Sequence, residues 1–336
     1  MTTQQTTHLP PKLAIVIHTE EEFDWNKGFY RSNTSVTHGK ELINFCDTLI
    51  ALGAKITFAL DYAFVKSDAG IRVINHFLPQ INNNVEFACH CHPWVNPPFA
   101  IEHLNKTEEA HDEAPVNEID SYPGNLAKNA EYEKIKTLTE AIQTITGQQP
   151  TTYLAGRYGI GSNTTKILSE LGYKIDLSIS PFVDFSHQQG PDFSNHNNKT
   201  FTKNGITNIP HTSGFVSYIP ELSQYLNNNP VSFKKLNASL LGKILFKLSS
   251  VKRHRLSPEG FTLTEMKNVT KALLQTKTEN LIFSFHSPSV KLGLTPYVTE
   301  QSLLDDFYKN TIDYITWYKN EITKETSLVS AMIDKI

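Results

Sequence analysis

The chain has 336 residues and a hydrophobic fraction of 39%, enough to bury a large core and to build one α/β barrel. Its formal net charge of −3 gives no overall basic surface for nucleic acid or for an anionic membrane, so we expect a small or neutral partner. Sparse cysteines, a polar chain start and no bilayer-length apolar stretch predict a cytoplasmic protein without disulfides, export signal or membrane insertion.

Short β-rich apolar runs alternate with helical stretches along the chain, which is the pattern of parallel βαβ units. We expect strands at residues 12–19, 55–60, 85–92, 152–157, 175–179, 207–211 and 281–286, and helices at 39–52, 71–82, 126–146, 163–171, 264–276 and 300–320. Seven such strands favour a distorted (β/α) barrel, with an open parallel sheet as the alternative. We therefore predict one domain over residues 12–330, after a disordered tail of residues 1–11.

Three segments interrupt this pattern. Residues 93–125 and 182–208 are expected to form long loops that follow strand ends and cover a site. Residues 231–255 are expected to form an inserted surface helix with a basic end, Lys252-Arg253-His254-Arg255, which we interpret as solvated rather than anion-binding.

The first motif with candidate catalytic or metal-binding residues lies at the end of the first expected strand and reads His18-Thr19-Glu20-Glu21-Glu22. Side chains alternate along a strand, so His18 and Glu20 lie on one face if the strand continues to Glu20. The motif offers a paired nitrogen and carboxylate, although an acidic cluster after a strand is also typical of a solvated turn.

The second motif is Cys89-His90-Cys91-His92, at the end of the expected strand 85–92. His90 and His92 share one face, where two imidazoles form half of a divalent metal site that a carboxylate from a neighbouring strand would complete. A hydrogen-bonded pair of core histidines is the alternative. Cys89 and Cys91 face the other way, and we expect them in the core under the helices.

Three further residues stand at the ends of expected parallel strands, where α/β folds place catalytic side chains. They are Arg157 in Gly156-Arg157-Tyr158-Gly159, Asp176, and His286 in His286-Ser287-Pro288-Ser289.

Taken in order, these motifs resemble those of the polysaccharide deacetylases, carbohydrate esterase family 4 with the NodB-homology domain, and in particular the WalW-like subgroup. The matching residues are His18 to Trp25, His90 to Trp94, Gly156 to Gly159, Gly190 to Ser194, Leu256 to Phe261, and His286 to Ser289 with Thr295 to Tyr297. The resemblance spans residues 13 to about 318, nearly the whole chain.

This resemblance implies hydrolysis of an N- or O-linked acetyl group on a sugar or polysaccharide precursor through a metal-activated water. The metal, zinc or another divalent ion, would be held by Glu20, His90 and His92. His286 matches the general acid that protonates the leaving group.

The resemblance also assigns supporting roles. Arg157 and Asp176 match the positions that orient the base and the acid, and the backbone N–H of Tyr158 would stabilise the oxyanion. Trp25, Trp94 and Tyr158 would stack on a sugar ring, and the two tryptophans are equally suited to packing the loops that carry them.

His18 is a departure from the family pattern, which has an aspartate as the general base at this position. A neutral His18 imidazole could act as the base, with Arg157 helping to keep it neutral. His18 could instead be a third nitrogen ligand that leaves Glu20 as the base, or the site could bind metal and sugar without turnover. The departure at His18 favours one competing function, a non-catalytic metal- and carbohydrate-binding protein. A second is an amidohydrolase on a small amide, because the same site chemistry cleaves any accessible amide.

Overall fold

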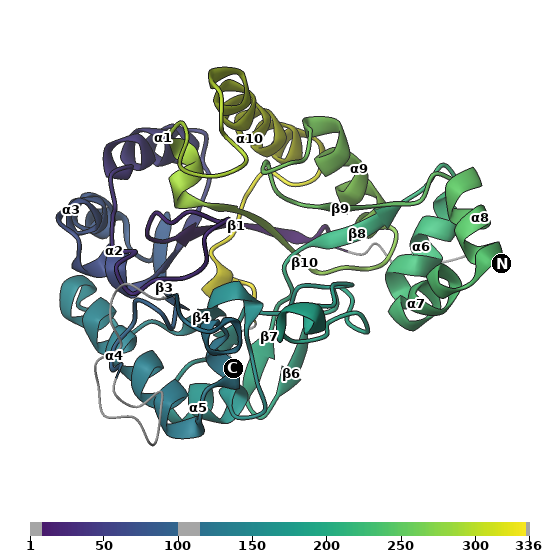
Figure 1. The fold of residues 1–336 in the computed structure, drawn as a ribbon. Helices are drawn as coiled ribbons and strands as arrows, with labels where there is room; N and C mark the ends of the chain where they lie inside the picture. Colours follow the sequence, from purple (N-terminus) through teal and green to yellow (C-terminus); the bar gives the residue numbers. More distant parts are fainter. Residues whose placement is uncertain (1–8, 100–114, 334–336) are drawn as a thin grey trace.

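The computed structural model describes residues 9–99 and 115–333, and it is built around an eight-stranded sheet (Figure 1). The strand order is β10-β1-β2-β3-β4-β5-β7-β6, and all neighbours are parallel except the β6–β7 hairpin. The strands are β1 (Lys12–Thr19), β2 (Ile56–Leu60), β3 (Val85–Cys91), β4 (Thr152–Ala155), β5 (Ile175–Asp176), β6 (Phe201–Lys203), β7 (Ile206–Asn208) and β10 (Asn280–His286).

The sheet curls into a half-barrel, which confirms the predicted fold class of a distorted (β/α) barrel built on parallel strands. Single backbone hydrogen bonds bridge its gap: Leu256 N–H donates to the Thr212 carbonyl, and Ser284 N–H donates to the Leu256 carbonyl. Segments without regular secondary structure therefore connect the region after β7 to β10, and no β-ladder forms between them. All seven predicted strands overlap observed ones, and β6 was not predicted.

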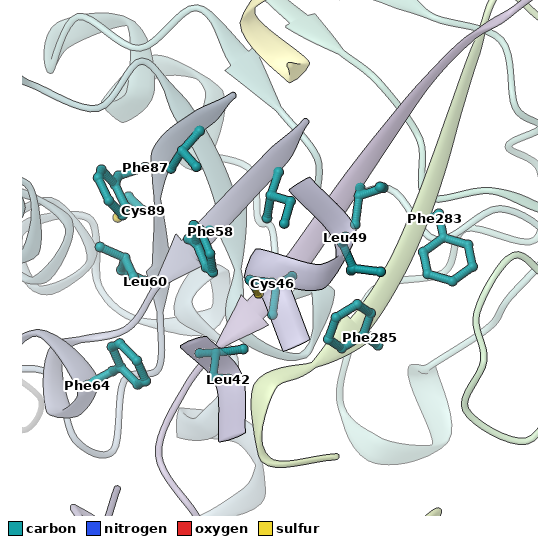
Figure 2. Close-up of a cluster of buried hydrophobic side chains, with 14 of the residues drawn as sticks. Leu42, Cys46, Leu49, Phe58, Leu60, Phe64, Phe87, Cys89, Phe283 and Phe285 are labelled. Atoms are coloured by element: carbon teal, nitrogen blue, oxygen red, sulfur yellow. The ribbon is translucent and has the colours of Figure 1, made fainter. Parts of the chain in front are cut away.

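Helices cover the outer face of the sheet, and the main hydrophobic core lies between the two layers. They are α1 (Gly39–Ala51), α2 (Tyr62–Lys66), α3 (Asp68–Phe77), α4 (Lys128–Thr146), α5 (Thr164–Glu170), α9 (Leu263–Leu274) and α10 (Gln301–Glu321). Figure 2 shows part of this core, where Cys46 and Cys89 lie among phenylalanine and leucine side chains. The prediction that Cys89 and Cys91 are core residues is confirmed, and burial raises the pKa of the Cys89 thiol to about 12.

The prediction of one surface helix over residues 231–255 was wrong. The chain forms a two-stranded antiparallel hairpin of β8 (Ser213–Val216) and β9 (Lys252–Arg255), with α6 (Pro220–Asn228), α7 (Pro230–Ala238) and α8 (Leu240–Leu248) inserted between the strands. Prolines at the starts of α6 and α7 and the Ser239 cap of α8 divide the segment into separate helices. The basic end is therefore a strand that runs back towards the barrel.

The predicted loops and tail are only partly covered by the described residues. Residues 100–114 of the first loop and 1–8 of the tail lie outside them, while residues 118–125 form short 3-10 turns. The 182–208 segment ends in the β6–β7 hairpin. Pro11, at the end of the predicted tail, is buried and its carbonyl accepts a hydrogen bond from Tyr318.

Candidate metal centre

Four of the predicted site residues converge at the carboxyl ends of β1 and β3. These two strands flank β2, which carries only the small Ala59 in register with His18. The rings of His18 and His90 can therefore approach across it, to 5.1 Å between centroids. The face alternation predicted from the sequence holds one residue beyond the end of β3, so His90 and His92 lie together.

The donor atoms form a compact, buried cluster. One ligand atom each from His18, Glu20 and His90 lie within 4.8 Å of one another. The His90 Nε2 atom lies 3.3 Å from the Glu20 carboxylate, and the His92 Nε2 atom lies 3.0 Å from His90 Nε2 and 3.5 Å from Glu20. Each of the four side chains is at most 4% exposed.

The hydrogen bonds made by the Nδ1 atoms of His90 and His92 determine whether each Nε2 atom carries a proton or a lone pair. His90 Nδ1 lies 3.0 Å from the Leu154 carbonyl, and His92 Nδ1 lies 2.9 Å from the Glu21 carboxylate. The Leu154 carbonyl requires a proton on His90 Nδ1, and the ionised form of Glu21, whose pKa burial raises to about 7, requires one on His92 Nδ1. Each neutral ring then turns an Nε2 lone pair to the other. Two lone pairs 3.0 Å apart beside a carboxylate repel unless a cation or proton lies between them. The donor set therefore fits a divalent metal that prefers nitrogen and oxygen ligands.

The electrostatics of the cluster agree with metal binding. Burial, followed by the neighbouring His92, lowers the pKa of His90, which keeps the ring neutral. Burial opposes the charged form of Glu20, but His286, His90 and His92 outweigh it and lower the pKa of this carboxyl. The cluster thus presents neutral imidazoles and a carboxylate, the protonation states that a metal requires.

Buried groups behind His92 fix its orientation. Glu21 accepts from His92 Nδ1 through one oxygen and from Trp94 Nε1, at 2.6 Å, through the other. Asp61 accepts from the backbone N–H of Glu21 and lies 3.7 Å from His92 Nδ1. Such carboxylate–histidine pairs orient metal ligands and raise their basicity. Glu21 is therefore buried and paired, unlike a side chain of a solvated turn.

His286 lies on the side of His18 that faces β10, with the two ring centroids 4.6 Å apart. Its Nδ1 atom lies 2.8 Å from the Glu259 carboxylate, whose other oxygen accepts from the backbone N–H of His286 and from Ser289. Burial opposes the charged ring, but Glu259 and Glu20 outweigh it and raise the pKa of His286. The side chain remains 18% exposed and can meet a bound molecule.

His18 also has neighbours outside the donor cluster, namely His211, Tyr158 and Arg255. His211 Nδ1 donates to the Leu177 carbonyl, so its Nε2 lone pair accepts from His18 Nε2 at 3.2 Å. The Arg255 guanidinium donates to the Tyr158 hydroxyl and packs over that ring. Burial, followed by His286 and His90, lowers the pKa of His18 well below its ordinary value. The ring of His18 is therefore neutral at neutral pH.

Arg157 and Asp176 do not contact the partners expected for them. Arg157 donates to Ser121 and Gln188 and packs over the ring of Tyr122. Asp176 accepts from the backbone and hydroxyl of Ser178 beside β5. In the structure the carboxylate bonded to His286 belongs to Glu259, and the guanidinium near His18 belongs to Arg255.

The three aromatic residues expected to stack on sugar have different surroundings. Trp94 is 1% exposed and stacks on His92 at 4.2 Å, so it is a buried support and has no free face for a ligand. Tyr158 is 9% exposed, and its ring lies 6.0 Å from the His18 ring at an interplanar angle of 72°. Trp25 is half-buried, makes an edge contact with His286 at 4.9 Å, and lines a pocket of about 480 Å³ with Thr295 and Pro296.

Sequence reasoning missed three residues of the site. His211 ends the predicted strand 207–211, so the rule that selected Arg157 and His286 also applies to it. Glu259 lies inside the Leu256 to Phe261 motif, in which no single residue was assigned a function. Arg255 was assigned to a helix end, and the strand assignment is what brings it to Tyr158.

No protein-family model matches the sequence, and no curated protein matches it. Among solved structures, the 4-alpha-glucanotransferase from Thermococcus litoralis is similar at 12% identity and a TM-score of 0.49, over 98% of this chain and 41% of that one. Puue allantoinase is similar at 12% identity and a TM-score of 0.46, over 95% of this chain and 88% of that one. The chitin deacetylase of Colletotrichum lindemuthianum is similar at 13% identity and a TM-score of 0.42, over 98% and 89%.

No helix within residues 9–99 and 115–333 combines the length and apolar character needed to cross a membrane. The fold and the donor set together define a barrel-type α/β protein with a buried histidine–carboxylate centre.

Proposed function

We propose that this chain is a metal-dependent hydrolase of the polysaccharide deacetylase type, which removes an N- or O-linked acetyl group from a sugar or polysaccharide precursor. One observation carries the proposal. The facing Nε2 lone pairs of His90 and His92 lie beside Glu20, and a carboxylate-paired His286 borders the same centre. Cation donors and an acid side by side are what hydrolysis of an acetyl group needs.

Glu20, His90 and His92 would hold the ion, zinc or another divalent metal, with a nitrogen of His18 within reach. When bound, the metal supplies Lewis-acid polarisation of the acetyl carbonyl and lowers the pKa of a water.

His286 supplies the proton for the leaving nitrogen or oxygen. Glu259 accepts from Nδ1 and, with Glu20, raises the pKa of the ring against the effect of burial, so the proton on Nε2 is retained until the leaving group takes it. This assignment gives Glu259 the orienting role that the family resemblance suggested for Asp176.

His18 has two roles open to it, because its neutral ring can accept a proton or bind the metal. His18→Asp separates them. Retained or higher turnover is expected if the position holds the base, whereas weaker metal binding without a gain in rate would assign His18 to ligation.

Trp25 is the aromatic residue that we expect to contact a sugar, because its ring touches His286 and also lines a pocket. The three cysteines are free, as a reducing compartment would leave them, which supports a cytoplasmic enzyme.

The test is acetate release from a panel of acetylated saccharides, with metal-stripped and zinc-loaded protein compared. Release is expected only with metal. His286→Gln should lower kcat by about 10²- to 10⁴-fold and leave zinc stoichiometry unchanged. Zinc binding without acetate release from any saccharide would contradict the proposal and favour a metal- and carbohydrate-binding protein.

A further inference from the structure

The α6–α8 unit projects beyond the helices that cover the sheet (Figure 1), and α8 exposes a row of large apolar side chains. Leu240, Leu241 and Leu248 are 76%, 80% and 78% exposed, and Ile244 and Leu245 are 47% and 40% exposed. Soluble surfaces commonly carry single exposed leucines, but a contiguous row of five on one helix marks an interaction site.

The helix has two apolar faces, and only one of them is used within the fold. Gly242 and Phe246 are four residues apart and point inward, where Phe246 joins the small core of the insertion. At 3.6 residues per turn the exposed leucines and isoleucine occupy an arc of about 140° on another face. The packing of the insertion therefore does not explain why these positions are apolar.

The basic residues around α8 indicate the charge of its binding partner. Between Glu221 and Glu259 the sequence has seven Lys and Arg residues and no Asp or Glu, in a chain whose net charge is −3. Lys243 and Lys247 flank the apolar row on α8 itself, and both are exposed. Lys235, Lys252 and Arg253 are also exposed nearby, whereas Lys234 pairs with Asp192.

We propose that α8 docks this protein on the surface of an anionic membrane, lying in the plane of the interface. The leucine row would enter the boundary between headgroups and acyl chains, and the lysines at its flank would meet anionic headgroups. An acidic protein groove would need carboxylates matched to each lysine, whereas a lipid surface satisfies both the apolar row and the diffuse basic charge. The proposal is independent of the chemistry at the metal centre.

The test is cosedimentation of the full chain with vesicles of phosphatidylcholine alone or of phosphatidylcholine mixed with phosphatidylserine. Binding is expected only to the mixed vesicles, and it should weaken at high salt. Lys243→Gln with Lys247→Gln should weaken binding roughly thirtyfold, because each basic residue near such a surface contributes about fivefold. Leu240→Ser, Leu241→Ser and Leu248→Ser together should weaken it by at least about tenfold.

The matched control is Leu292→Ser with Leu303→Ser, two leucines that are 44% and 38% exposed outside the insertion, and it should bind as the parent does. Thermal melting checks that each variant is folded. Absence of parent binding to the mixed vesicles, or equal binding by all variants, overturns the proposal. A dimer in analytical ultracentrifugation that the leucine variant dissociates, without vesicle binding, overturns it in favour of a second copy of the chain.

Discussion

Glu21→Gln tests how the metal centre is oriented, because both oxygens of Glu21 are in use. One oxygen accepts from His92 Nδ1 at 2.9 Å and the other from Trp94 Nε1 at 2.6 Å. Glutamine has a single acceptor oxygen, so one of the two buried donors loses its partner. If His92 loses it, the ring can move its proton to Nε2, the nitrogen that faces His90.

A buried donor left without its partner costs about 1–3 kcal/mol, and loss of such a support weakens metal binding by about 10- to 100-fold. We expect that loss for Glu21→Gln in competition titrations of zinc against a chromophoric chelator. Adding Trp94→Phe removes the competing donor, so the double variant should recover part of the affinity. Wild-type zinc affinity in Glu21→Gln would refute the assigned orientation of His92, and an additive double variant would show that Trp94 does not compete.

Glu259→Gln removes the charge that raises the pKa of His286, so the alkaline limb of the pH profile of kcat/KM should move to lower pH. Burial raises the pKa of Glu131 from 4.5 to about 7, so the free energy of unfolding falls as the pH rises between these values. Glu131→Gln should remove this slope. In urea unfolding, the free energy of unfolding of the variant relative to that of the parent should therefore rise by up to about 3 kcal/mol between pH 4 and pH 8. A Cβ on Gly156 would clash with the backbone carbonyl oxygen of Cys91 and would lie 2.7 Å from the His92 ring. Gly156→Ala should therefore cost about 1–3 kcal/mol in the same assay and weaken zinc binding, and unchanged values would show that the loop moves without cost.

The convergence of the candidate metal ligands could be predicted from the sequence because two simple rules govern it. Strand alternation sets which side chains share a face, and parallel strands of one sheet end at the same edge. His18, Glu20, His90 and His92 are close to strand ends, so their convergence depends on little beyond the strand assignments.

The second half of the site depends on features that local patterns do not encode. Arg255 reaches Tyr158 because an insertion of three helices returns as β9, and the basic run in that strand equally suits a solvated helix end. Glu259 lies in a short irregular segment, where period-two or period-3.6 reasoning has nothing to act on. The orientation of His286 depends on its contact with Glu259, and a contact between two segments far apart in the sequence cannot be inferred from either segment alone.

The pairing of β1 with β10 joins strands from opposite ends of the chain, and it sets His18 in register with His286. During synthesis, Glu20, His90 and His92 are all made long before His286 leaves the ribosome. A nascent or prematurely ended chain would therefore hold the candidate metal ligands while lacking the proposed proton donor, and its first strand would have an open edge. Completion of β10 seals this edge and adds His286 in the same step, so under the proposed mechanism an incomplete chain would lack the acid that the hydrolysis needs.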